Sequence, residues 1–219
     1  MTVRENISVA QAIRSMLPQG GGVALCDVNA SHPPLWPGED DAIRRAVSTR
    51  IREFTAGRAA ARIAMTDAGL APAAITTTQG RAPNWPMGIS GSITHTAQLA
   101  AAIVARRPDW PSIGLDLEHA VPMDDHTADL IRHPMDFVVP SLPPALAATL
   151  LFSAKEAAFK AQFPLTGLWI DYRDVALRIL TNGFSLQVQG VPLTGRWRTA
   201  NGLFVTTVLI GPDQADALL

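Results

Sequence analysis

The chain has 219 residues, of which 47% are hydrophobic and 17% charged, a balance typical of a globular protein with a buried core. Its formal net charge of -1 argues against a nucleic-acid-binding protein that relies on bulk electrostatics. The single Cys26 excludes an internal disulfide and a multi-cysteine metal site, and no run of apolar residues is long enough to predict a membrane span. Because residues 1–20 also lack the apolar core of a signal peptide, we expect a cytoplasmic protein.

The first third of the chain predicts a long helix. An amphipathic segment at 9–17 and an apolar run at 23–26 come first, and acidic residues at 39–41 then favour a helix N-terminus. The helix is expected to extend to about residue 68, with one side rich in arginine. Its expected apolar side comprises Ile43, Val47, Ile51, Phe54 and Ile63. Arg58 and Arg62 lie one turn apart on the other side, where two guanidinium groups suit a phosphate, although a solvated basic face explains the same spacing.

A loop and two strands are predicted next. Residues 80–91 are rich in glycine and proline and display Arg81. Alternation at 92–96 predicts a strand with Ser92, Thr94 and Thr96 on one face and His95 on the other, paired with an apolar strand at 100–105. His95 has two interpretations, a hydrogen-bonded core histidine or a cation that binds phosphate near neutral pH.

The segment 113–118 predicts a strand that carries two carboxylates on one face. Leu115 and Leu117 point one way, and Asp116 and Glu118 point the other, about 7 Å apart along the strand. Such hard oxygen ligands suit Mg²⁺, which usually adds waters and substrate phosphate oxygens. The alternative is a pair of exposed acids on an edge strand.

The second half predicts a helix followed by an antiparallel meander. A loop-rich stretch at 119–144, with a short helix at 128–131, leads into a helix at 145–163. Alternating runs follow at 175–180, 184–189, 195–199 and 203–210, with Asn-Gly turn signals at 182–183 and 201–202.

The helix at 145–163 contains both lysines of the chain, Lys155 and Lys160. Glu156 stands four residues before Lys160, so both side chains project from one helix face. An ordinary surface ion pair has the same spacing, and Ser153 with Glu156 also fits a capping box. Three phenylalanines at spacings of seven and four are expected to anchor the helix in a core, namely Phe152, Phe159 and Phe163.

Four blocks of sequence carry a resemblance to a known family. They are Gly57-Arg58-x-x-x-Arg62, Trp85-Pro86-x-Gly88-x-x-Gly91-Ser92-Ile93-Thr94-His95-Thr96, Gly114-Leu115-Asp116-Leu117-Glu118, and Phe152-Ser153-Ala154-Lys155-Glu156-Ala157-Ala158-Phe159-Lys160. In order and spacing, over about residues 39–180, they resemble the 4′-phosphopantetheinyl transferases of the surfactin/enterobactin-synthetase type. Phe152 stands where many relatives have tryptophan, a conservative aromatic change.

The resemblance implies an α+β fold of two similar lobes, each a helix with antiparallel strands, with the cofactor between them. We place the lobes at 1–111 and 112–219 within one catalytic unit. The implied activity is transfer of the phosphopantetheine arm of coenzyme A to a serine of an apo carrier protein, with release of 3′,5′-ADP. A monomer is implied, and the pathways are nonribosomal peptide, siderophore or polyketide synthesis.

The resemblance also assigns site residues. It implies Mg²⁺ held by Asp116, Glu118 and Glu156, with Glu156, or a water beside the metal, as the base for the serine. Lys160 would compensate charge on the leaving group, and His95 would contact the 3′-phosphate or the pyrophosphate. The other positions expected to bind coenzyme A are Arg58, Arg62, Arg81, Ser92, Thr94, Thr96, Asp116 and Lys155, the last of which could instead contact the carrier.

Two other functions fit parts of the same pattern. A Mg²⁺-dependent phosphodiesterase would share the three carboxylates but would consume coenzyme A without a carrier. A carrier-binding module would keep the fold and lack the chemistry.

Overall fold

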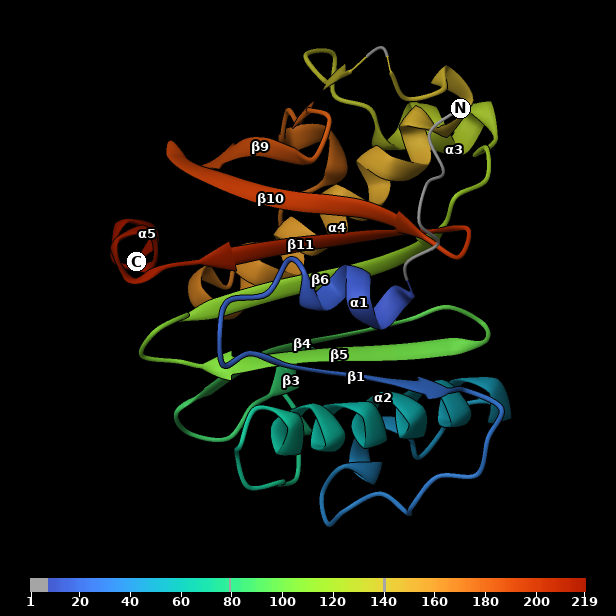
Figure 1. The fold of residues 1–219 in the computed structure, drawn as a ribbon, viewed down its shortest axis with the longest axis vertical. Coiled ribbons are helices and arrows are strands. Elements are labelled where there is room, and N and C mark those ends of the chain that lie inside the picture. Colours follow the sequence, from blue (N-terminus) through green and yellow to red (C-terminus); the bar gives the residue numbers. More distant parts are fainter. Residues whose placement is uncertain (1–7, 79, 140) are drawn as a thin grey trace.

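The computed structural model describes residues 8–78, 80–139 and 141–219. Helices pack on mainly antiparallel sheets, which confirms the expected α+β class (Figure 1). In the described residues no helix is long and apolar enough to cross a membrane.

The first sheet has three antiparallel strands in the order β1-β5-β4, with the helix α2 packed on it (Figure 1). The bounds are β1 Gly22–Asp27, α2 Ser48–Asp67, β4 Ile89–His95 and β5 Leu99–Arg106. Alanines at 56, 60 and 64 are fully buried in the core between α2 and the sheet. Their small side chains allow the helix to lie close to the strands.

The second sheet has six strands in the order β6-β11-β10-β9-β8-β7, and the helix α4 crosses it (Figure 1). The bounds are β6 Ser112–His119, β7 Phe137–Val138, α4 Ala147–Thr166, β8 Arg178–Ile179, β9 Gly183–Val188, β10 Val191–Ala200 and β11 Leu203–Ile210. A Cβ on Gly114 would lie 1.9 Å from the carbonyl oxygen of Ala157. Glycine at this point of β6 therefore allows α4 to lie directly on the strand.

Shorter elements complete the fold. They are α1 Val9–Arg14, α3 Asp125–Ile131, α5 Pro212–Leu218, β2 Thr76–Thr77, β3 Pro83–Asn84, and the 3₁₀ segments η1 Asp40–Ile43, η2 Pro144–Leu146 and η3 Tyr172–Asp174. The predicted strand at 175–180 is wrong over most of its length, because only two residues of it pair, as β8. The turn at Asn201-Gly202 is confirmed, with both residues at positive φ.

The predicted apolar and arginine-rich faces of α2 are wrong. Val47, Ile51 and Ile63 are exposed, whereas Arg58 and Arg62 are buried. The helix packs through its alanines, and the two arginines enter the interior because protein acceptors meet their guanidinium groups there.

The faces of α4 also differ from the prediction. Phe152, Phe159 and Phe163 line a cavity, and the core is formed by leucines and alanines of the opposite face. Ser153 is not an N-cap, since it lies fully buried inside the helix and hydrogen-bonds Thr206 of β11.

The two sheets meet where β4 lies beside β6 (Figure 1). The hydroxyl oxygen of Ser92 on β4 accepts a hydrogen bond from the backbone N–H of Leu115 on β6, at 3.0 Å. The Thr94 hydroxyl donates to the carboxylate of Asp116, at 3.1 Å. Side chains of β4 thus join two strands that belong to different sheets, and most of the side chains predicted from the sequence as functional lie around this seam.

Candidate active site

A cavity of about 400 Å³ opens at the seam between the sheets. Its walls come from α2, the loop before β4, and β4, β6 and α4. Of the predicted site residues it is lined by Arg58, Arg81, Ser92, Thr94, His95, Asp116, Glu118, Glu156 and Lys160.

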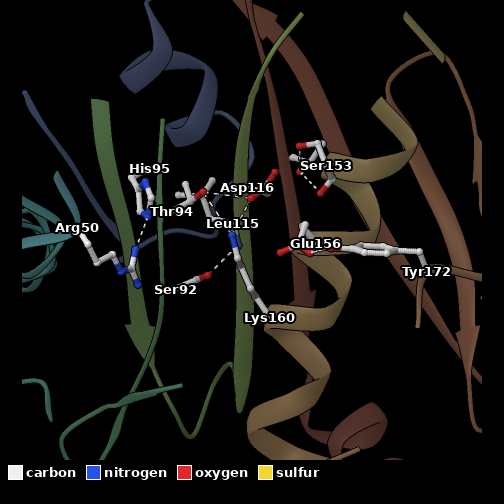
Figure 2. Close-up of polar contacts among 11 residues, drawn as sticks. Arg50, Ser92, Thr94, His95, Leu115, Asp116, Ser153, Glu156, Lys160 and Tyr172 are labelled. Atoms are coloured by element: carbon white, nitrogen blue, oxygen red, sulfur yellow. Dashed lines mark hydrogen bonds and ion pairs between the residues drawn. The ribbon is translucent and has the colours of Figure 1, made fainter. Parts of the chain in front are cut away.

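Asp116 lies at the centre of the polar groups (Figure 2). Its Oδ1 accepts hydrogen bonds from Nζ of Lys160, at 2.6 Å, and from the hydroxyl of Thr94. Its Oδ2 is buried and has no hydrogen-bond partner among the described residues. A buried carboxylate oxygen without a partner is costly, so this atom is available to a ligand.

Glu118 follows on the same face of β6, as the alternation of the strand predicted. Burial raises its pKa to about 7, and the neighbouring charges of Asp116 and Glu156 add to this, against the opposing effect of Lys160. Three carboxylates therefore act on one another electrostatically within the cavity.

Glu156 projects from α4 and accepts a hydrogen bond on Oε1 from the hydroxyl of Tyr172 (Figure 2). Burial raises the pKa of Tyr172, and the hydrogen bond and charge of Glu156 raise it further, so that the phenol stays protonated as a donor. The sequence had not indicated Tyr172. It is the only tyrosine of the chain, and this compositional signal could have found it.

The three carboxylates fit a divalent cation by their chemistry. In the described residues no three or more His, Cys, Asp or Glu side chains converge closely enough to hold a metal ion. Lys160 contacts Asp116, and Tyr172 contacts Glu156. The unpartnered oxygen of Asp116 and the raised pKa of Glu118 are both features that a cation would relieve. The Mg²⁺ site formed by Asp116, Glu118 and Glu156 therefore stays a prediction, for which the side chains present are chemically suitable.

Arg58 supplies buried positive charge to the cavity. Its Nε donates to the carbonyl oxygen of Ile75, at 2.7 Å, and its guanidinium lies 4.1 Å from the centre of the Phe54 ring. Burial lowers its pKa to about 10. No carboxylate forms an ion pair with Arg58 in the described part of the chain, so an anionic ligand would meet a desolvated cation there.

His95 contacts a residue that the sequence analysis missed. Nε2 of His95 lies 2.8 Å from an Nη atom of Arg50, which can only donate, so Nε2 acts as the acceptor of a neutral ring. Burial lowers the pKa of His95, with Glu53 opposing and Arg50 and Lys160 reinforcing the shift. Arg50 lies on α2 eight residues before Arg58, and this spacing of about two turns was the available signal.

Sequence similarity to known proteins extends over the part of the chain that forms this site. The family profile described as the 4′-phosphopantetheinyl transferase N-terminal domain matches residues 38–105. The 4′-phosphopantetheinyl transferase PptT of Mycobacterium tuberculosis is 33% identical over 231 residues, covering 93% of this chain and 100% of the relative. The chain belongs to the 4′-phosphopantetheinyl transferase family.

Two further proteins are similar to this chain in sequence. The 4′-phosphopantetheinyl transferase Svp of Streptomyces mobaraensis is 34% identical, covering 94% of this chain and 92% of its own. Enterobactin synthase component D of Salmonella typhi is 37% identical over 153 residues, which is 65% of this chain and 62% of that protein.

Three residues that the sequence placed at the cofactor lie outside the main cavity of the transferase. Arg62 pairs with the fully buried Glu39, at 2.8 Å. Lys155 is buried on another side of α4, and the Thr96 hydroxyl accepts backbone hydrogen bonds within the turn that follows β4. Contacts of Arg62 and Thr96 with coenzyme A therefore gain no support from the cavities, whereas Lys155 lines a second, mainly apolar cavity beside the main one.

Proposed function

We propose that the protein transfers the phosphopantetheine arm of coenzyme A to a serine hydroxyl of an apo carrier protein. The serine oxygen forms a bond to the β-phosphorus, the bond from that phosphorus to the bridging oxygen breaks, and 3′,5′-ADP leaves. One observation carries the proposal: a single cavity in a chain of this family holds three carboxylates together with Lys160, Arg50 and Arg58. This is the charge pattern that a pyrophosphate with a bound divalent cation requires.

Eight ionisable residues of the cavity are given a task in this reaction. Asp116, Glu118 and Glu156 would hold Mg²⁺, which when bound neutralises the pyrophosphate and polarises the phosphorus. Glu156 accepts the proton of the serine hydroxyl. Lys160, held beside Asp116, places an ammonium group where charge develops on the departing 3′,5′-ADP. Arg50, Arg58 and the neutral His95 form the anion-binding side, with Arg81 exposed at its rim.

A second cavity offers space for the phosphopantetheine arm of coenzyme A. About 230 Å³ of mainly apolar space adjoins the main cavity, and Glu156 and Phe159 line both. A pantetheine arm that extends from the phosphate into this space would leave the phosphorus at Glu156.

All the proposed catalytic groups come from one chain, which supports a monomer as the active unit. We keep the division into lobes at 1–111 and 112–219, because the first sheet ends before residue 112 and β6 begins there. The named relative enterobactin synthase component D supports carriers of siderophore-forming peptide synthases as partners.

The test is the intact mass of apo carrier domains incubated with the protein, coenzyme A and Mg²⁺. We expect a gain of roughly 340 Da, the transferred arm, that disappears with EDTA and with Glu156→Gln. The panel would include carriers from peptide, polyketide and fatty-acid synthesis. Consumption of coenzyme A without any modified carrier would instead indicate a phosphodiesterase, and unmodified carriers with intact coenzyme A would contradict the transferase activity.

A further inference from the structure

Glu156 is held from the side that faces away from the other carboxylates. In the described residues its one hydrogen bond comes from the Tyr172 hydroxyl, which reaches Oε1. Figure 2 shows the tyrosine ring and the glutamate pointing toward each other, with Asp116 and Lys160 on the other side of Glu156. Tyr172 lines the apolar cavity and not the main one, whereas Glu156 lines both.

The position of Tyr172 is fixed by a buried charged group. Its carbonyl oxygen accepts a hydrogen bond from Nζ of Lys155, at 2.7 Å. The same ammonium donates to Asp136 and to the carbonyl oxygen of Ile131, both at 2.9 Å. Lys155 and Asp136 have side chains only 4% and 5% exposed, so this pair is shielded from solvent. The Tyr172 ring also packs against Phe152, with 5.4 Å between ring centres.

These contacts connect the buried Lys155 to the Glu156 carboxylate in the cavity through Tyr172. Lys155 and Glu156 are neighbours on α4, and Tyr172 contacts both, one through its carbonyl and the other through its hydroxyl. The phenol occupies one carboxylate oxygen and leaves the second oxygen for the cavity. The hydrogen bond thereby favours one orientation of a side chain that has three rotatable bonds.

We propose that Tyr172 is a positioning residue, whose hydroxyl holds the Glu156 carboxylate toward the main cavity while the Lys155–Asp136 pair holds the tyrosine. The inference rests on the proposed function, since it assigns Glu156 the proton-accepting and metal-holding role. Partners that orient a ligating carboxylate typically affect metal affinity or activity by about 10- to 100-fold.

The first experiment replaces the hydroxyl alone. Tyr172→Phe keeps the ring packing, and we expect kcat to fall about 10- to 100-fold with little change in KM for coenzyme A. Calorimetric titration of Mg²⁺ into the protein with coenzyme A should show weaker binding by a similar factor. Thr149→Val is the matched control, because it also removes one hydroxyl hydrogen bond of α4, to Val121, away from both cavities.

The outcomes separate the two proposals. Wild-type protein without transfer to any carrier overturns the proposed function. Wild-type transfer with Tyr172→Phe matching Thr149→Val in kcat and in Mg²⁺ binding overturns the positioning role alone. A fall in thermal stability with kcat and Mg²⁺ binding unchanged would also overturn it, because that is the effect of a purely structural residue.

A second readout does not depend on turnover. Because Tyr172 is the only tyrosine, growth with 3-fluorotyrosine labels this position alone, and fluorine NMR then gives one tyrosine resonance. We expect Glu156→Gln to shift that resonance, and Mg²⁺ with coenzyme A to shift it in the wild type. A resonance unchanged by Glu156→Gln would show that the contact does not exist in solution.

Discussion

The two lysines of the chain occupy opposite environments on one helix. Nζ of Lys155 is buried and donates to three protein acceptors. Burial lowers the pKa of Lys155, against the opposing effect of Asp136. Lys160 has a side chain 26% exposed and reaches Asp116 in the cavity. Spacing along α4 therefore places one ammonium in the interior and the other in the cavity, and the tasks proposed for them differ accordingly, structural for Lys155 and catalytic for Lys160.

Substituting each lysine should separate these tasks. Lys155→Met leaves Asp136 as an unpaired buried charge, and we expect it to lower the free energy of unfolding by about 3–5 kcal/mol. Lys160→Met should lose less stability but reduce transfer about 100-fold or more, because it removes a charged donor from the reacting groups. Denaturant unfolding and initial rates on the same samples measure both. Equal stability losses with equal rates would contradict the division.

Glu118 gives a pH dependence with a definite sign. Its folded pKa of about 7 lies above its ordinary value of 4.5, so the folded state binds more protons between these pH values. Stability in EDTA should therefore fall as pH rises from about 4.5 to 7, through this group. Glu118→Gln removes that loss, and its melting temperature relative to wild type should rise over the same window. A constant difference between pH 4 and pH 8 would show that Glu118 is not strained by its neighbours.

The absence of a side chain at Gly114 allows α4 to approach β6 closely. A Cβ at Gly114 would overlap the Ala157 carbonyl, which is backbone and cannot move aside by rotation. The position lies two residues before Asp116, so the approach that glycine permits also places the carboxylate against α4 and Lys160.

Gly114→Ala should destabilise the protein by at least about 1–3 kcal/mol, the usual cost of inserting a methylene into a packed core. Gly211→Ala is the control, since a Cβ there meets nothing within 4 Å and φ is -79°. We expect it to cost less than about 1 kcal/mol, as a change of a helix cap. Thermal unfolding followed by circular dichroism would measure both. Equal melting temperatures would mean that α4 shifts freely.

Patterns of alternation and turn residues predicted the main strands and both long helices, because these depend on local chemistry. The face of α2 could not be predicted, since two buried arginines are acceptable only with Glu39, Ile75 and Thr77 beside them, and these partners lie far away in sequence. For the site, the motifs identified Asp116, Glu118, Glu156 and Lys160, all of which line the cavity. Tyr172 and Arg50 lie outside the motifs and required three-dimensional contacts.

The two sheets share one cluster of buried apolar residues. Ile13 of α1 is fully buried in a cluster with apolar residues of β5, β6 and β11. A segment from the start of the described chain is thus packed against strands from its end. The proposed lobes should therefore unfold together.

Ile13→Ala tests this coupling. We expect a loss of about 2–5 kcal/mol and one calorimetric transition at a lower temperature, because the cavity weakens both sheets at once. Leu130→Ala, at a half-exposed position of α3, serves as the control. Two separate transitions in the variant would show that the halves are independent.

The seam between β4 and β6 has a mechanical consequence. Hydroxyl side chains join the strands there, and the cavity opens along the same line. A bound pyrophosphate that contacts Arg58 of α2 on one side and Lys160 of α4 on the other would connect the two halves of the fold. Substrate would then add a link between the two sheets during each turnover, and release of 3′,5′-ADP would leave them joined by the hydroxyl contacts and the shared apolar core until the next coenzyme A binds.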